Sequence, residues 1–99
     1  MRARHADKDL ERLEVDAEFY CGYAENIVKA FRKRMQLVRA VRDERDLYAM
    51  KSSRFEKLKG ARSHQHSIRL NDQMRLILEF EGRGPDKTLV VMGIEDYHS

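Results

Sequence analysis

The chain has 99 residues, of which 41% are hydrophobic and 37% are charged, and its formal net charge is +3. This length allows one modest core and predicts a single domain over residues 1–99. The apolar content excludes global disorder, and no run approaches the roughly 18 apolar residues of a membrane-spanning helix.

The N-terminal stretch lacks the apolar region of a secretory signal. Because Cys21 is the single cysteine, an internal disulfide and a CxxC metal site are also excluded. We therefore expect a cytoplasmic protein.

Two helices are predicted in the first half of the chain, after a short edge strand at residues 2–6. Asp7 is a candidate N-cap for a helix that runs through Leu10 and Leu13, which lie three residues apart. Residues 24–42 carry the clearest amphipathic pattern, with apolar side chains on one stripe and most cations outside it. We interpret those cations as a solvated outer face.

The second half of the chain changes to the alternation of β-strands. Residues 43–53 are expected to be a connection and residues 55–58 a short strand. Residues 66–71 and 74–81 alternate apolar and polar side chains, whereas residues 88–94 form the continuous apolar run of a strand covered on both faces. We therefore predict an α+β fold, in which N-terminal helices pack on one face of a small antiparallel sheet.

The positive charge is concentrated in the predicted sheet. Residues 1–50 hold 11 basic and 10 acidic residues, a balance of +1. Residues 51–78 hold seven basic and two acidic residues, a balance of +5, and residues 79–99 hold two and five, a balance of −3. A local cationic surface is typical of a protein that binds a polyanion such as nucleic acid. A solvated charged surface is the alternative.

The turn between the two alternating strands predicts which side chains share a face. A three-residue loop pairs Ile68 with Leu76, whereas a two-residue loop would pair Ile68 with Arg75, so the hydrophobic pattern favours the longer loop. That register sets Arg69 opposite Arg75 on the other face, where the two cations repel each other. A phosphate bound between them would reverse this effect, and separate ion pairs with acidic neighbours are the alternative.

The C-terminal sequence Asp96-Tyr97-His98 adds a carboxylate, a phenol and an imidazole at the end of the apolar strand. Cleavage of RNA without a metal needs three things. A base takes the proton of the 2′-OH, cations stabilise the charge on the phosphorane, and an acid protonates the leaving 5′-oxygen. Histidine suits either proton-transfer role because it titrates near neutrality. The sequence contains no metal-ligand spacing and no glycine-rich phosphate loop, so no metal and no cofactor are expected.

The stretch LKGARSHQHSIRLNDQMRLIL, residues 58–78, together with the terminal DYH, resembles the HigB toxins of the RelE/ParE superfamily. The resemblance implies the toxin of a bacterial type II toxin–antitoxin system. Such a toxin is an endoribonuclease, or mRNA interferase, that enters the ribosomal A site. It cleaves the bound message by metal-independent attack of the 2′-OH on the phosphodiester, and thereby inhibits translation. The resemblance also implies the RelE-like fold of helices followed by a compact sheet.

The same resemblance assigns catalytic roles to five positions, which are Lys59, Arg75, Asp96, Tyr97 and His98. Lys59 and Arg75 would stabilise the charge of the phosphate, and His98 would transfer a proton. Glu56, which stands where some family members have histidine, is a candidate base. We further expect RNA contacts from Lys57, Arg62, Arg69 and Asn71. Which group is the general base and which the general acid stays open.

The partners implied by the resemblance are the ribosome with its mRNA and a cognate HigA-like antitoxin with a helix-turn-helix domain. Operator DNA would be bound through the antitoxin, and no membrane is involved. Two alternatives are a ParE-like toxin that inhibits gyrase and a non-catalytic module that binds nucleic acid through the same face. The presence of Lys59, Arg75 and the Asp-Tyr-His end argues against a gyrase inhibitor, in which those groups would have no role.

Overall fold

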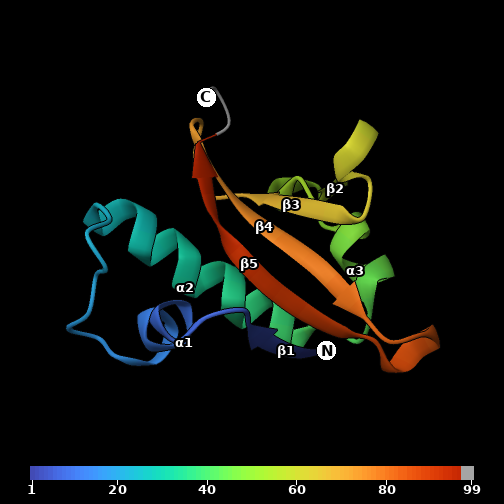
Figure 1. Cartoon of the computed structure of the whole chain (residues 1–99), viewed down its shortest axis with the longest axis horizontal. Helices are drawn as coiled ribbons and strands as arrows, with labels where there is room; N and C mark the ends of the chain where they lie inside the picture. The colour runs from blue at the N-terminus through green and yellow to red at the C-terminus, as the bar shows by residue number, and fades with distance from the viewer. Residues whose placement is uncertain (97–99) are drawn as a thin grey trace.

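The computed structural model describes residues 1–96 and shows helices packed on one side of a five-stranded sheet (Figure 1). The elements are β1 (Arg2–His5), α1 (Lys8–Val15), α2 (Glu25–Ala40), α3 (Glu44–Ala49), η1 (Lys51–Ser53), β2 (Glu56–Lys57), η2 (Gly60–Arg62), β3 (Gln65–Arg69), β4 (Met74–Glu81), η3 (Gly84–Asp86) and β5 (Thr88–Asp96). The strand order is β1-β5-β4-β3-β2.

The predicted α+β class and the predicted edge strand are confirmed. The sheet is mixed rather than wholly antiparallel, because β1 runs parallel to β5. None of the helices within residues 1–96 is long and apolar enough to cross a membrane.

The first two helices begin and pack as their sequences predict. The side chain of Asp7 caps α1 by accepting a hydrogen bond of 2.8 Å from the backbone N–H of Leu10. The apolar stripe of α2 faces the sheet, and its buried members are Ile27, Val28, Phe31, Met35 and Val38. These side chains meet those of the covered face of the sheet, which are Ile68, Leu70, Leu76, Leu78, Leu89 and Val91.

Three cations of α2, Arg32, Arg34 and Arg39, donate hydrogen bonds to other elements and so have structural roles rather than solvated ones. The guanidinium of Arg32 donates hydrogen bonds to the backbone carbonyls of Leu13, Asp16 and Phe19, at 3.0, 2.8 and 3.1 Å. These carbonyls lie at and beyond the last turn of α1, where a helix leaves its C=O groups without intrahelical partners. Arg32 therefore joins α1 to α2. Lys29 and Lys33, by contrast, are exposed as expected.

Residues 43–53 are not the irregular connection that their sequence suggests. They contain α3 and η1, and Asp43 caps α3 by accepting a hydrogen bond of 2.9 Å from the N–H of Arg45. Leu47 is the fully buried residue of α3. A six-residue helix is too short to show a repeated hydrophobic period, which explains why the pattern does not reveal it.

The hairpin of β3 and β4 has the predicted register. Ile68 lies opposite Leu76 on the covered face, and Arg69 lies opposite Arg75 on the uncovered face. We call this uncovered side of the sheet the open face. The apolar residues of the hairpin are buried against the helices, so the register that buries them also directs both arginines to the open face.

Strand β5 contains a bulge that its sequence does not reveal. Ile77 pairs with Gly93 and Leu78 pairs with Val91, so Met92 is an extra residue without a partner on β4. The bulge shifts the alternation of β5 by one residue. Residues on both faces of the strand are buried before the bulge, as the continuous apolar run predicts, but Met92 itself is 36% exposed.

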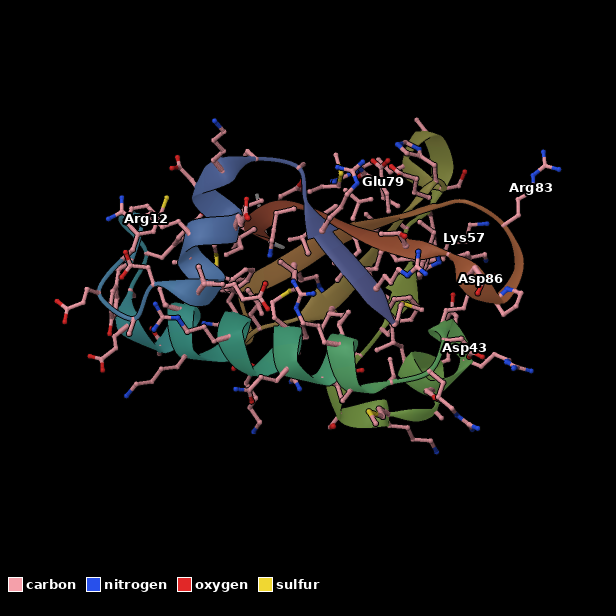
Figure 2. The ribbon with its side chains drawn as sticks, turned by 90° about the horizontal axis from the view of Figure 1, so that it is seen from below. Arg12, Asp43, Lys57, Glu79, Arg83 and Asp86 are labelled. Atoms are coloured by element: carbon pink, nitrogen blue, oxygen red, sulfur yellow. The ribbon has the colours of Figure 1, made fainter. Side chains whose placement is uncertain are left out.

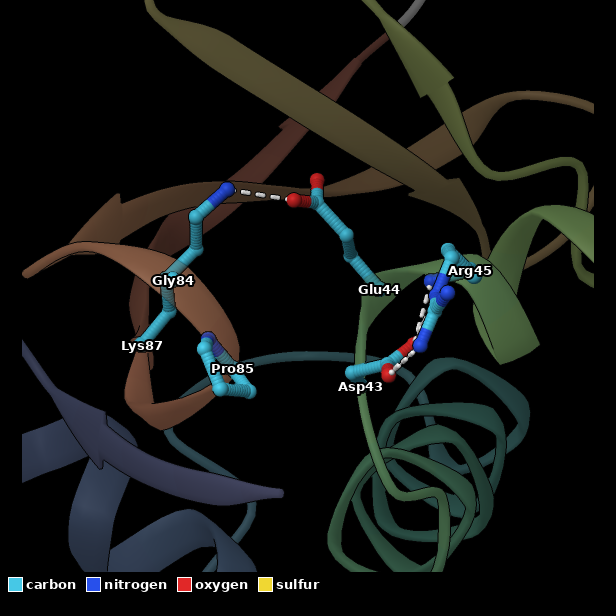
Figure 3. Close-up of a pocket in the computed structure, with 6 residues that line it drawn as sticks. All are labelled: Asp43, Glu44, Arg45, Gly84, Pro85 and Lys87. Atoms are coloured by element: carbon cyan, nitrogen blue, oxygen red, sulfur yellow. Dashed lines mark hydrogen bonds and ion pairs between the residues drawn. The ribbon is translucent and has the colours of Figure 1, made fainter.

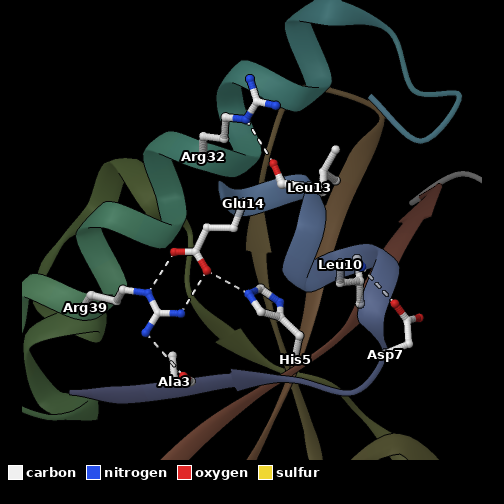
Figure 4. A network of polar contacts seen from close by, with 8 residues as sticks. All are labelled: Ala3, His5, Asp7, Leu10, Leu13, Glu14, Arg32 and Arg39. Carbon is white, nitrogen blue, oxygen red and sulfur yellow. Dashed lines mark hydrogen bonds and ion pairs between the residues drawn. The ribbon is translucent and has the colours of Figure 1, made fainter. Parts of the chain in front are cut away.

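A polar cluster joins β1 to both long helices (Figure 4). Glu14 on α1 accepts two hydrogen bonds from the guanidinium of Arg39 on α2, at 2.7 and 2.8 Å, and contacts His5 Nε2 on β1 at 2.7 Å. Arg39 also donates to the carbonyl of Ala3. The hydrogen bond with Arg39 is the main cause that lowers the pKa of Glu14. Burial opposes this shift, and His5 supports it.

The lowered pKa of Glu14 predicts how the stability of the fold depends on pH. A carboxyl whose pKa is lower in the folded state stabilises the fold above its unfolded pKa, about 4.3, and loses this contribution as the pH falls through its folded pKa. The free energy of unfolding of wild type should therefore exceed that of Glu14→Gln at about pH 5, and the difference should shrink towards about pH 3. Urea unfolding at several pH values measures it.

The matched control is Glu11→Gln, which changes an exposed carboxylate on the same helix. Its difference from wild type should stay nearly constant over the same pH range. A constant difference for Glu14→Gln would contradict the role given to the ion pair with Arg39.

Candidate active site on the open face of the sheet

A cleft of about 390 Å³ lies on the open face, near the end of β5. Its walls contain the predicted site residues Lys59, Arg62, Arg75 and Asp96, together with Leu58, Ile77 and Glu95. These residues come from the β2–β3 connection, from β4 and from β5. The fold thus brings together residues that are distant in the chain, such as Lys59 and Asp96, which lie 37 positions apart.

The strand pairing explains why these groups meet. Arg75 is the second residue of β4 and lies opposite Glu95, which precedes Asp96 at the end of β5. Lys59 follows β2, and Gly60 after it has a φ of 66°. Glycine adopts a positive φ without steric strain, so the Lys-Gly sequence lets the chain turn sharply and leaves Lys59 at the cleft.

Arg62 and Glu95 form an ion pair at the cleft. The two terminal nitrogens of Arg62 donate to the two carboxylate oxygens of Glu95 at 2.9 and 2.8 Å, and Arg62 Nε donates to Gln65 Oε1 at 2.8 Å. The hydrogen bond with Glu95 raises the pKa of Arg62 above its ordinary value. Both side chains are nearly half exposed. The pair connects the β2–β3 connection to β5.

The two opposed arginines each have a carboxylate of their own. Arg75 is only 12% exposed and forms an ion pair with Glu56 at 3.0 Å. Arg69 forms an ion pair with Asp72 and donates to the backbone carbonyl of Asn71 at 3.2 Å. Separate ion pairs, the alternative that the sequence left open, therefore offset the repulsion in the folded chain.

Lys59 differs from the neighbouring arginines. It is exposed, and no carboxylate within residues 1–96 forms an ion pair with it. Asp96, which lies opposite Met74 in the pairing of β4 with β5, accepts a hydrogen bond of 2.8 Å from the amide of Gln73. Lys59, Arg75 and Asp96 are all among the residues that line the cleft.

Asn71 holds the hairpin turn together. Its side-chain oxygen accepts hydrogen bonds from the N–H groups of Gln73 and Met74 at 2.8 and 2.6 Å. This is the local turn that Asn favours, and the RNA contact expected of Asn71 stays a prediction. The side chain of Asn71 is therefore placed to fix the register of the hairpin.

Lys57 lies on the other side of the sheet from the cleft. It pairs with His66 across β2 and β3, and the ring of His66 stacks on Phe55 with centroids 5.0 Å apart on the helix-covered side. This side follows from the β3–β4 register, because His66 lies two residues before Ile68 on the same strand. Tyr97 and His98, two of the five predicted catalytic residues, lie outside the residues that the structure describes.

Two residues near the cleft were missed by sequence reasoning, Glu95 and Ser67. Ser67 is fully buried, and its hydroxyl accepts a hydrogen bond of 3.4 Å from Arg75 Nη1. The predicted β3–β4 register already directs Ser67 to the face of Arg75, and this was the available signal. Glu95 carried no such signal, because the bulge at Met92 shifts the alternation of β5.

A second hollow, of about 450 Å³, lies between the start of α3 and the β4–β5 connection (Figure 3). Lys87 forms an ion pair with Glu44 across it, and Arg45 forms one with Asp43 at 2.9 Å. None of the predicted site residues lines this hollow. Its charges join α3 to the end of the sheet.

The position of Lys57 can be tested through His66. Burial is the main cause that lowers the pKa of His66. Lys57 and Lys87 lower it further, whereas Glu44 raises it. Replacing Lys57 with Gln removes a nearby positive charge, so the pKa of His66 should rise, as measured by an NMR titration of its ring protons. Lys51→Gln is the control and should leave this pKa unchanged. A pKa that does not respond to Lys57→Gln would contradict the placement of Lys57 beside His66.

Comparisons with known proteins agree with this architecture. The family of HigB-like toxins, described as "RelE-like toxin of type II toxin-antitoxin system HigB", matches residues 3–98. The solved "YoeB/ParE toxin from Agrobacterium tumefaciens" is similar in fold, with a TM-score of 0.55 and 18% identity, and the alignment covers 98% of this chain and 99% of that chain. No curated protein matches the sequence. The chain belongs to the HigB-like family of RelE-type toxins of type II toxin–antitoxin systems.

Proposed function

We propose that the protein is a ribosome-dependent endoribonuclease that cleaves mRNA in the ribosomal A site and so inhibits translation. Toxins of the HigB-like RelE family are typically ribonucleases, and this chain matches the family over residues 3–98. One observation carries the proposal. Lys59, Arg62 and Arg75 line one cleft, and Asp96 at the end of β5 also lines it. This is a suitable set for binding and cleaving a phosphodiester.

The proposed reaction is an attack within the RNA itself. A base removes the proton of the 2′-OH, the 2′-oxygen bonds to the adjacent phosphorus, and the bond from phosphorus to the 5′-oxygen breaks. An acid gives a proton to that 5′-oxygen, so the products carry a 2′,3′-cyclic phosphate and a 5′-OH. Arg75 and Lys59 stabilise the negative charge that grows on the phosphate oxygens.

The proton transfers fall to the C-terminal residues. Asp96 lines the cleft, where it either takes the 2′-OH proton or orients His98. His98 transfers a proton, since imidazole titrates near neutrality. Tyr97 stacks on a base or bonds to the phosphate. No step in this scheme requires a metal ion.

The carboxylates of the free protein do not prevent RNA from binding. Arg62 and Glu95 are both nearly half exposed, and an exposed ion pair contributes only about 0–1 kcal/mol. A phosphate, whose oxygens match the fork of a guanidinium, can therefore replace Glu95 as the partner of Arg62. Arg69, opposite Arg75, would contact the next phosphate along the strand.

The partners follow from the family. A type II toxin has a cognate antitoxin, and we propose a HigA-like antitoxin with a helix-turn-helix domain, which links the complex to operator DNA. The ribosome presents the message. The toxin would act in the bacterial cytoplasm as a single domain of residues 1–99.

The proposal predicts the loss of cleavage when the cleft loses its cations. Arg75→Ala and Lys59→Ala should each lower the rate of cleavage of ribosome-bound message about 10²–10³-fold, because a group that stabilises charge in the transition state contributes about that much. The measurement is primer extension on a defined message bound to purified ribosomes. Arg83→Ala is the matched control, since Arg83 projects from the β4–β5 connection at the far end of the sheet (Figure 2).

The same assay separates the alternatives. A protein that inhibits gyrase and leaves message intact would be a ParE-like toxin. Binding that weakens steeply with salt, without any cleavage, would indicate a non-catalytic module. Equal cleavage of free and ribosome-bound message would indicate an ordinary ribonuclease and would contradict ribosome dependence.

A further inference from the structure

The buried side of Arg75 is held by two groups that reach it from neighbouring strands. Arg75 Nη1 lies 3.0 Å from a carboxylate oxygen of Glu56 on β2 and 3.4 Å from the hydroxyl of Ser67 on β3. The Arg75 side chain is 12% exposed, and Ser67 is fully buried. Nη1 of Arg75 is thus held by a carboxylate on β2 and by a hydroxyl on β3.

The strand register places these groups together. Glu56 lies directly opposite Ser67 in the pairing of β2 with β3. Ser67 lies opposite Ile77 in the pairing of β3 with β4, so it is the diagonal neighbour of Arg75 on the same face. Diagonal neighbours on one face of a sheet are within reach of a long side chain. Arg75 therefore extends across β3 towards β2.

Glu56 does not belong to the cleft. Glu56 is not among the residues that line the cleft, and it is one of the residues around a separate hollow of about 370 Å³, with Tyr48, Lys51, Arg54 and Phe55. The acidic residues that line the cleft are Glu95 and Asp96. A general base must lie within hydrogen-bonding reach of the proton that it removes. Glu56 lies beside Arg75 rather than among the groups that face the cleft.

Given the proposed ribonuclease activity, we infer that Glu56 and Ser67 are positioning residues for Arg75 and that Glu56 is not the general base. Glu56 is the counter-ion of the guanidinium, and the Ser67 hydroxyl supports the same nitrogen from the core side. Together they fix the direction in which Arg75 meets the phosphate. The base is then one of the groups at the cleft itself or at the chain end.

A buried hydroxyl under a guanidinium has a clear physical reason. A buried polar group without a partner is destabilising, so a buried serine is expected to have a specific hydrogen bond. The Ser67 hydroxyl accepts a hydrogen bond from Arg75. Alanine at this position would fill nearly the same space and would remove only this contact. Ser67→Ala is therefore a precise test of positioning.

The test is single-turnover cleavage of ribosome-bound message over about pH 5–9 by wild type, Glu56→Gln and Ser67→Ala. The amide oxygen of Glu56→Gln still accepts from Arg75, so the maximal rate should fall by less than about tenfold and the pH profile should keep its shape. Loss of a general base would instead cost about 10²–10⁴-fold and would remove the base limb of the profile. Glu11→Gln, an exposed change on α1, is the matched control.

Ser67→Ala should lower the maximal rate by about three- to tenfold, in line with the net contribution of one ordinary hydrogen bond. It should change the Kd of an uncleavable 2′-deoxy message by less than about twofold. Ser52→Ala, at an exposed serine, should have no effect. In an Arg75→Lys background, Ser67→Ala should cost little more, because residues that act through one contact are not additive.

The outcomes separate the two claims. Absence of cleavage by wild type refutes the proposed function. Cleavage by wild type, with a loss of 100-fold or more and a flattened pH profile in Glu56→Gln, refutes the positioning role of Glu56 and makes it the base. Full additivity of Ser67→Ala with Arg75→Lys refutes the role of Ser67. Thermal unfolding of each variant confirms that it is folded, and Glu56 is exposed enough for its variant to test the inference independently.

Discussion

The pairing of β3 with β4 is the constraint on which the rest of the structure depends. It buries Ile68 and Leu76 against the helices and thereby sends Arg69 and Arg75 to the open face. A shift of one residue would exchange the two faces, burying two guanidiniums and exposing the apolar residues. The hydrophobic core thus fixes the position of the site. The side-chain oxygen of Asn71 closes the turn that sets this pairing.

Arginine has two different uses in this chain, and its surroundings distinguish them. Arg32 donates to three backbone carbonyls at the end of α1, so it joins two helices and is fully engaged by the fold. Arg62 and Arg75 are held by the carboxylates of Glu95 and Glu56, beside a cleft. The exposed carboxylate of Glu95 can give way to a phosphate, and Glu56 leaves part of the Arg75 guanidinium to meet one, whereas the backbone carbonyls of a helix end cannot be replaced without disturbing the fold.

The features that could be predicted from the sequence are those that follow from a hydrophobic period or a strand register. The amphipathic pattern of α2, the cap at Asp7 and the alternation in the β3–β4 hairpin each rest on local repetition. Their predictions were confirmed, including the opposition of Arg69 and Arg75. The RNA contacts expected of Lys57 and Asn71 stay predictions. In the folded chain Lys57 lies opposite His66, and the side chain of Asn71 bonds within the turn.

The features that could not be predicted from the sequence lie where the hydrophobic pattern is too short or is interrupted. α3 is too short to show a period, and the bulge at Met92 reverses the alternation of β5, so the place of Glu95 opposite Arg75 could not be derived. The ion-pair partners of the arginines could not be predicted either. Each arginine has several acidic residues near it in the sequence, and only the folded strands determine which carboxylate lies within reach. The contacts of Arg32 with the carbonyls near the end of α1 could not be predicted for the same reason, because they depend on how the two helices pack.

A cryo-EM structure of the toxin on a ribosome that carries a message with a 2′-deoxy sugar at the cleavage position would test the central claim most directly. The account predicts that the scissile phosphate lies on the open face, with a phosphate oxygen about 3 Å from the guanidinium of Arg75 and with Glu56 still bonded to that guanidinium. A scissile phosphate bound on the helix-covered side of the sheet, or away from Arg75, would contradict it.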